Sequence, residues 1–193
     1  MSKPSLFVKT ETREFFAHHM LLHASALEIA DAEETQFSRF NSCLAAMVMT
    51  SLAVEALLNA VGGRVVQDWK AFERLPPSEK LDLLISELGI DRQFGIEPWT
   101  TLIFIFGFRN DIAHPKPEQI VQTKTLPEAA LNLNFSTPMS SLEEEITLGN
   151  AKRVYGAVAS LKGILTDSLS PDLRFGIYVD AWSHSTSAKP HEA

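Results

Sequence analysis

The secondary structure of residues 98–114, PWTTLIFIFGFRNDIAH, decides the fold class of this chain. Leu102 to Phe108 is rich in aromatic and β-branched residues, which favour a strand. The length of the stretch, and Pro98 at a helix-start position, favour a helix. We predict a helix from Pro98 to His114, in which Gly107 costs about 1 kcal/mol relative to alanine unless another group packs closely against it.

Two long helices are predicted before this stretch. Apolar residues at three- and four-residue steps predict one over residues 11–34 and the other over residues 36–61, where Gly62-Gly63 ends it. The periodicity of the second helix places Glu55 on or near its inward stripe, and a carboxylate there needs a partner. The run from Cys43 to Val61 is apolar, but it contains Glu55 and several Ala, Ser and Thr, so a central core helix fits better than a membrane span.

Two shorter signals complete the helical pattern. Pro76-Pro77-Ser78 opens a short helix from Glu79 to Leu88, and Gly89 stops it. Thr147 is typical of an N-cap and begins a final helix that ends at about Ser168.

The segment 115–146 interrupts the helices and contains four of the prolines. Residues 120–123 and 131–135 are candidates for two short strands, so the segment is predicted to be irregular or a β-hairpin. The fold class that follows is all-α: an up-down bundle of about four to five helices with this excursion before the last long helix. We expect one domain, residues 1–170, and a C-terminal tail, residues 171–193, that is ordered only in part.

Composition restricts the class of function. The formal net charge is −7, so the chain as a whole repels nucleic acid, and any contact with RNA must come from a local basic cluster. The single cysteine, Cys43, cannot form an internal disulfide and is predicted to be a small core residue. Because the first residues also lack the apolar run of a signal peptide, we expect a cytoplasmic protein with no membrane partner.

Three polar side chains, Arg109, Asn110 and His114, follow the apolar run of the decisive stretch. Pro115 ends the helix there, because the residue before a proline is pushed out of the α region. Arginine is a permanent cation whose fork geometry suits phosphate, and histidine gives or takes a proton near neutral pH. This pair suffices to cleave an RNA phosphodiester by attack of the neighbouring 2′-hydroxyl, a route that requires no metal.

Arg109 and His114 lie five residues apart, about 140° around a regular helix. They converge only where the helix ends and the arginine reaches round, and we expect both to face a common solvent-reachable hollow beside the same two residues of a second copy. Spacing alone is not specific, because Arg13 and His18 have the same separation. The second instance differs in its context: Asn follows the Arg, an apolar helix leads in and Pro follows the His.

Arg109-Asn110-Asp111-Ile112-Ala113-His114 resembles the Arg-x4–6-His motif of the HEPN superfamily (higher eukaryotes and prokaryotes nucleotide-binding domains). The stretch 51–60 is similar to the polar-punctuated inner helix of that family, and the resemblance covers about residues 11–168. It implies a helical bundle that dimerises with the two motif copies meeting in a cleft. Many members are metal-independent ribonucleases of toxin–antitoxin and defence systems, whereas others have no demonstrated catalysis.

The resemblance implies a role for each residue of the motif. Arg109 would bind the phosphate and stabilise the transition state, His114 would be the general acid or base, and Asn110 would orient the imidazole or a phosphate oxygen. Independently of the resemblance, periodicity suggests Glu55 as the partner of Arg109. Lys116 is expected to add a second positive charge near the mouth of the site. No metal and no cofactor is expected, and RNA or a nucleotide, an antitoxin or a nucleotidyltransferase are the implied ligands and partners.

Three functions stay open at this point. The first is an endoribonuclease that leaves a cyclic phosphate, and the second is a non-catalytic dimerising module that binds a nucleotide, an RNA or a protein. The third is a structural bundle in which Arg109 and His114 only cap a helix. His19 and His23 have a spacing that can hold a metal, but no matching Glu-x-x-His pair accompanies them.

Overall fold

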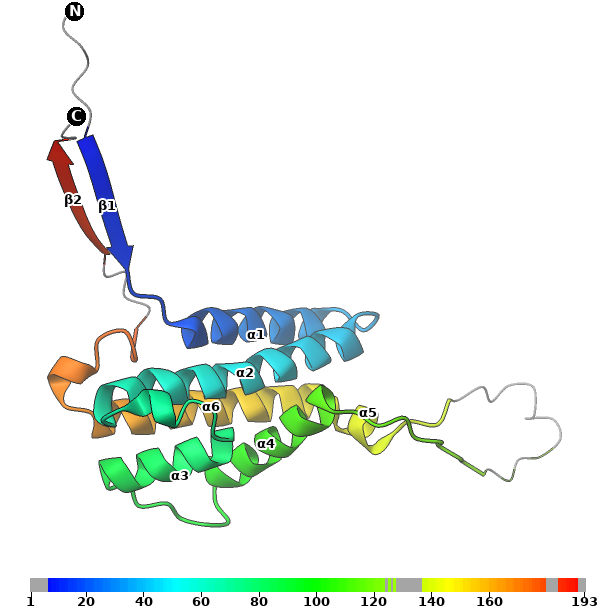
Figure 1. The fold of residues 1–193 in the computed structure, drawn as a ribbon. Helices are drawn as coiled ribbons and strands as arrows, with labels where there is room; N and C mark the ends of the chain where they lie inside the picture. Colours follow the sequence, from blue (N-terminus) through cyan, green and yellow to red (C-terminus); the bar gives the residue numbers. More distant parts are fainter. Residues whose placement is uncertain (1–6, 124, 126, 128–136, 180–183, 191–193) are drawn as a thin grey trace, which may run out of the picture.

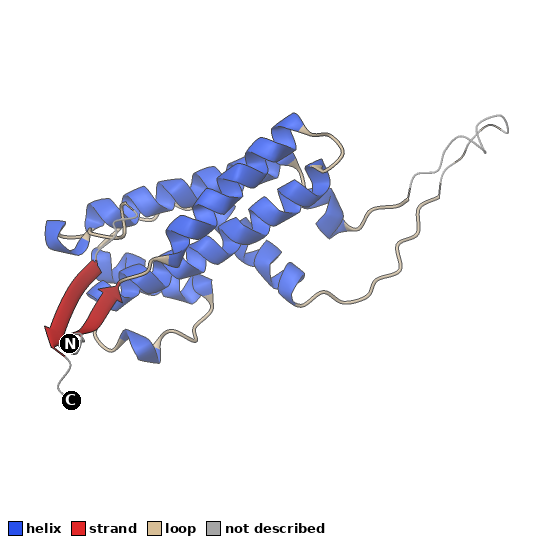
Figure 2. Cartoon of the chain, turned by 90° about the horizontal axis from the view of Figure 1, so that it is seen from above, coloured by secondary structure: helices blue, strands red, loops and turns tan. Residues whose placement is uncertain are grey.

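The structure is a computed structural model that describes residues 7–123, 125, 127, 137–179 and 184–190. It is a bundle of helices, with a two-stranded ribbon at one end and an extended segment at the other (Figure 1). The helices are α1 (Ala17–Glu34), α2 (Arg39–Val65), α3 (Pro77–Leu88), α4 (Trp99–Ala113), α5 (Ser141–Glu145) and α6 (Leu148–Ser168). The predicted all-α helical bundle is therefore confirmed, and Figure 2 shows from above that helices make up nearly all of its body.

Helix α4 forms from the stretch whose sequence favours both strand and helix. Its large buried side chains, Trp99, Leu102, Ile105 and Phe108, recur at every third residue. A strand would send these side chains alternately to opposite faces, whereas a helix gathers them on one side. Burial on one side therefore outweighs the local β propensity.

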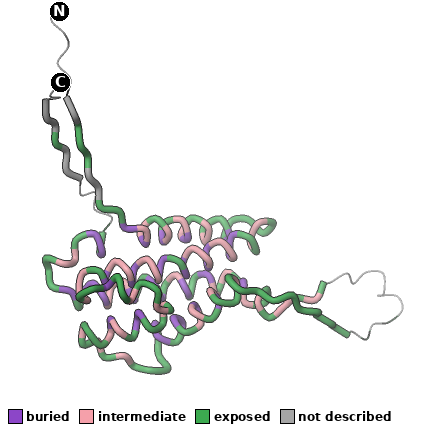
Figure 3. Tube along the Cα trace, viewed as in Figure 1, coloured by how far each residue is buried: buried purple, intermediate pink, exposed green. Residues whose placement is uncertain are grey.

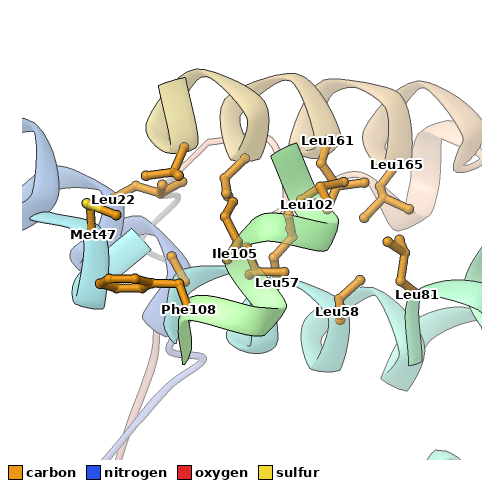
Figure 4. Close-up of a cluster of buried hydrophobic side chains, with 14 of the residues drawn as sticks. Leu22, Met47, Leu57, Leu58, Leu81, Leu102, Ile105, Phe108, Leu161 and Leu165 are labelled. Carbon is orange, nitrogen blue, oxygen red and sulfur yellow. The ribbon is translucent and has the colours of Figure 1, made fainter. Parts of the chain in front are cut away.

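Helix α2 lies at the centre of the bundle and packs against α1, α3, α4 and α6. Figure 4 shows the core that results, in which side chains from α1, α2, α3, α4 and α6 converge. Figure 3 shows the buried residues on the inward sides of the helices. Among the described helices, α2 alone is long and apolar enough to cross a membrane by length and composition, and half of its apolar window is buried in the bundle.

The prediction that Gly62-Gly63 ends α2 is wrong, since the helix continues to Val65. A Cβ at Gly62 would overlap the ring of Trp69, which lies in the 3-10 turn η1 (Trp69–Ala71). Gly62 therefore lets the following turn approach the helix closely, and it does not end the helix. Gly89 does end α3, in the left-handed conformation with φ 64°, and Thr147 caps α6 by accepting a hydrogen bond from the backbone N–H of Asn150 at 3.1 Å.

The N-terminal prediction is also corrected, because α1 begins at Ala17 rather than at residue 11. Residues before it form β1 (Phe7–Arg13), which pairs antiparallel with β2 (His184–Pro190). The partner strand lies at the other end of the sequence, and local periodicity carries no information about it. The ladder of backbone hydrogen bonds that it supplies replaces the helical bonds expected there.

Within the C-terminal tail, Gly176 and Ile177 pack on the bundle, whereas residues 184–190 form β2. The side chain of Ile177 is fully buried. Nε2 of His18 lies 3.2 Å from the carbonyl oxygen of Ile177, and Nε2 of His19 lies 2.7 Å from the carbonyl oxygen of Gly176. Gly176 has φ 77°, and a Cβ there would overlap the Phe16 ring, so only glycine fits.

The excursion before α6 is irregular where the structure describes it. Residues 115–123 form no strand, so the first of the two candidate strands, 120–123, is absent. The second candidate, 131–135, lies outside the described residues.

Candidate functional site

Three helices meet at a pair of salt bridges around Glu55 of α2. One carboxylate oxygen, Oε1, accepts a hydrogen bond from Nζ of Lys80 on α3 at 3.1 Å. The other, Oε2, accepts from Nη2 of Arg109 on α4 at 3.2 Å. The contact between Glu55 and Arg109 that periodicity suggests is therefore present, and one carboxylate fixes two cations from different helices.

Sequence reasoning missed Lys80. Its side chain is fully buried, whereas those of Glu55 and Arg109 are 27% and 34% exposed. A lysine is almost never fully buried without a partner, because the loss of its hydration costs several kcal/mol. A signal was available, since Lys80 lies four residues before Leu84, on the buried stripe of α3.

Arg109 is oriented by Glu55 and still reaches solvent. Its other described hydrogen bond, from Nη1 to Oδ1 of Asn110, is long at 3.5 Å. A guanidinium carries five N–H donors, so Arg109 retains donors for an oxygen ligand such as a phosphate. Asn110 is exposed and its Oδ1 lies next to Arg109, and its expected role of orienting the imidazole or a phosphate oxygen stays a prediction.

His114 is the C-cap residue of α4, with φ −133° and ψ 47°, and its backbone N–H donates to the carbonyl of Asn110 at 2.9 Å. The predicted end of the helix before Pro115 is confirmed. The exposed ring lines an open hollow of about 600 Å³ between the end of α4 and the start of α5. The hollow is lined by Asp111, His114, Pro115, Lys116, Glu118, Ser140, Ser141, Leu142 and Glu145.

Arg109 is not among the residues that line the hollow beside His114. Arg109 turns toward Glu55 on α2, whereas His114 opens toward the start of α5. The two positions are about 140° apart around a regular helix, and Glu55 fixes the guanidinium of Arg109 beside α2. The expectation of a common hollow, formed beside the same pair of residues in a second copy, therefore stays a prediction.

The hollow beside His114 has a mixed charge. Lys116 lines it, next to His114 as the sequence suggested, but three carboxylates, Asp111, Glu118 and Glu145, line it too. A phosphate in this hollow would meet more negative than positive side chains, so one chain does not form a strongly basic surface there.

The solvent-exposed face of α4 runs along the helix to Asn110 and His114 of the motif. Ile103 is 57% exposed, a Cβ at Gly107 would meet no atom within 4 Å, and Asn110 and His114 continue the same line toward the helix end. These positions recur at three- and four-residue steps and so share one face. Nothing described in the chain packs against Gly107, so its expected cost to the helix has no compensation within the monomer.

Comparison with known proteins finds no family model, no curated protein and no solved structure that matches the chain. The site is therefore described by its own geometry. Among the described residues, no group of three or more His, Cys, Asp or Glu side chains is arranged to hold a metal ion.

Proposed function

We propose that this chain is a HEPN-type protein of the cytoplasm that acts as a homodimeric, metal-independent endoribonuclease of a toxin–antitoxin or defence system. The observation that carries the proposal is that Arg109, fixed by Glu55 at 3.2 Å, and His114, exposed at the C-cap, end the same helix. An oriented cation and a solvent-reachable imidazole are the two groups that cleavage through the 2′-hydroxyl needs.

A second copy of the chain completes the site in this proposal. Two α4 helices that cross near Gly107 would cover the exposed Ile103 side chains and bring the two motif ends together. A glycine at a crossing point lets two helices approach closely. The Arg109 of one copy then faces the His114 of the other across the interface, which removes the angular separation within a chain.

The chemistry follows from these roles. Arg109 binds the non-bridging oxygens of the phosphate and stabilises the added negative charge of the transition state. His114 of one copy takes the proton of the 2′-hydroxyl, whose oxygen attacks phosphorus as the bond to the 5′-oxygen breaks. The imidazole of the other copy gives a proton to that leaving oxygen. The products are a 2′,3′-cyclic phosphate and a 5′-hydroxyl.

The test is cleavage of labelled RNA by the purified protein in the presence of EDTA. We expect Arg109→Ala and His114→Ala each to lower the rate by about a hundredfold or more, with cyclic-phosphate ends on the products of the wild type. Arg74→Ala, which removes an exposed arginine elsewhere, is the matched control and should cleave as the wild type does. Equal cleavage by all four proteins would reject the assigned roles.

A second candidate function, a dimerising module that binds a nucleotide, an RNA or a protein without catalysis, is favoured by the three carboxylates in the hollow beside His114. These charges oppose RNA binding. Growth arrest on overexpression that His114→Ala relieves would favour the enzyme. Absence of toxicity together with tight binding of an antitoxin or nucleotidyltransferase partner would favour the module.

A further inference from the structure

The ribbon of β1 and β2 extends away from the helical bundle (Figure 1). Its strands pair along their full length, from Phe7 opposite Pro190 to Arg13 opposite His184, and each has one neighbouring strand among the described residues. A two-stranded ribbon alone is at best marginally stable in water, and stable sheets usually have three or more strands. The outer edges of β1 and β2 are therefore candidate surfaces for another strand.

The two outer edges differ in how well they suit another strand. β2 ends in Pro190, and a proline at a sheet edge opposes pairing because it has no backbone N–H to donate. β1 contains no proline and has threonine, a residue type favoured in strands, at positions 10 and 12. The edge of β1 is therefore the better surface for an added strand.

The length and centre of β1 favour pairing with a second copy of itself. Thr10 is the middle residue of this seven-residue strand. Two identical antiparallel neighbours are related by a two-fold axis perpendicular to the sheet, and an axis through Thr10 pairs every residue of β1 with one in the other copy. In this register Lys9 of one copy lies opposite Glu11 of the other, and symmetry makes the same contact a second time.

Lys9 and Glu11 are placed for this contact. They lie on the same face of β1, where Nζ of Lys9 is 2.6 Å from Oε1 of Glu11, and their side chains are 59% and 60% exposed. An ammonium has three donors and a carboxylate accepts at both oxygens, so each can also contact the opposite charge of a second copy.

The charges also exclude the neighbouring registers. An axis moved by one residue along the strand places Lys9 opposite Lys9, or Glu11 opposite Glu11 in the other direction. Like charges directly opposite each other destabilise a strand pair. The full overlap of the two strands and the match of their charges therefore select the same register.

We propose that β1 pairs antiparallel with β1 of a second copy, with Thr10 opposite Thr10, to form a four-stranded sheet in the order β2-β1-β1-β2. One strand edge covers far less than the roughly 1,200 Å² of a stable interface, so the association is weak, with a Kd of about a millimolar, and brings copies together where the protein is concentrated. The contact uses none of the residues of the proposed α4 interface and does not depend on RNA cleavage.

Disulfide trapping of Thr10→Cys in the full chain tests the pairing. Directly opposite residues of an antiparallel pair have Cα atoms about 4.5 to 5.5 Å apart, a distance that a disulfide can span. The native Cys43 is buried. Ser187→Cys is the matched control, because Ser187 is exposed and lies opposite Thr10, but on β2. Under mild oxidation we expect Thr10→Cys to form covalent dimers at least about tenfold faster than Ser187→Cys.

Charge reversals test the register. In the Thr10→Cys background, Lys9→Glu alone and Glu11→Lys alone should each slow trapping by about tenfold, because two opposite-charge pairs become two like-charge pairs. The two substitutions change the net charge and the reactivity of the nearby thiol in opposite directions, so neither effect explains slowing by both. An equal mixture of the two variants should recover fast trapping, since opposite charges then face each other at both positions.

A last variant separates this contact from the proposed α4 dimer. Ile103→Glu combined with Thr10→Cys should trap as fast as Thr10→Cys alone, and loss of trapping would overturn β1 as a separate surface. The proposal is also overturned if the mixed charge variants trap no faster than either alone. Finally, it is overturned if Thr10→Cys traps no faster than Ser187→Cys, which would leave the edge for a strand of a different protein or for none.

Discussion

At the scale of single residues, Glu55 determines where Arg109 points. Periodicity placed Glu55 near the inward stripe of its helix, and the need of a buried carboxylate for a partner predicted an arginine contact that the structure contains. The same argument applied to α3 would have found Lys80, whose ammonium shares the carboxylate. What residue-level reasoning could not supply is which cation meets which oxygen, since three helices must pack before these groups meet.

The shared carboxylate leads to a stability prediction. Glu55→Gln should lower the free energy of unfolding by about 3 kcal/mol, because it leaves the fully buried Lys80 ammonium without its counter-charge. The double variant Glu55→Gln/Lys80→Met should recover most of that loss, since no buried charge remains. Urea denaturation of the two variants measures the difference. A double variant no more stable than Glu55→Gln would show that the lysine does not depend on this carboxylate.

Asp31 is expected to make stability depend on pH. The hydroxyls of Ser42 and Ser38 donate to its Oδ2 at 2.6 and 2.9 Å, respectively, and these bonds, that of Ser42 most, hold the pKa of Asp31 below its ordinary value of 3.8. A lowered folded-state pKa stabilises the fold above the unfolded-state pKa, and this contribution is lost as the pH falls through the lower, folded-state value.

The urea midpoint of the wild type should therefore fall more than that of Asp31→Asn between about pH 5 and about pH 2.5. The other carboxylates titrate in both proteins, so the difference reports Asp31 alone. Parallel pH profiles would show that the serine hydroxyls do not favour the ionised form.

At the scale of elements, helix boundaries followed the sequence where a cap or a proline marks them and departed from it where packing intervenes. Pro98, Thr147 and Gly89 mark boundaries that the structure has, because the chemistry that starts or stops these helices is local. Gly62-Gly63 looked like a stop signal, but α2 continues to Val65, because the close neighbour of Gly62 is Trp69 beyond the helix end. In the sequence, a glycine pair that ends a helix cannot be told from one that makes room for a neighbouring side chain.

The two neighbouring glycines of α2 should respond in opposite directions to the same substitution. Gly62→Ala should lower the free energy of unfolding by about 1 to 3 kcal/mol, because the new methyl group overlaps the buried ring of Trp69. Gly63→Ala, which meets no atom within 4 Å, should raise it by up to about 1 kcal/mol through helix propensity. Thermal or urea unfolding of both variants measures this. Stabilisation by both substitutions would mean that Trp69 does not pack on Gly62 in solution.

At the scale of the whole molecule, the exposed face of α4 is where we propose that a second copy binds. A single chain presents Ile103 to solvent and leaves Gly107 open. It also fixes the guanidinium beside Glu55, whereas the imidazole lines a hollow to which Arg109 does not contribute. A homodimer about α4 would account for all of these features together, since an isologous interface buries the same face on both copies.

Sedimentation equilibrium tests the proposed dimer. We expect the wild type to be a dimer and Ile103→Glu to shift it to a monomer, because a charge at the centre of an apolar interface is desolvated without a partner. Leu27→Glu is the matched control, since Leu27 is 59% exposed on α1 and Ile103 is 57% exposed on α4. It should leave the dimer intact. A wild type that is a monomer at high micromolar concentration would contradict the proposal that two copies form the site.

The helical class of this protein, the caps of its helices and the polar motif at the end of α4 were readable from the chain alone, because each depends on residues a few positions apart. Only the tertiary structure decided three other features: the pairing of β1 with β2, the burial of Ile177, and the sharing of Glu55 by Lys80 and Arg109. Each of these joins segments from different parts of the sequence, and such contacts form only when burial of the common core brings the segments together.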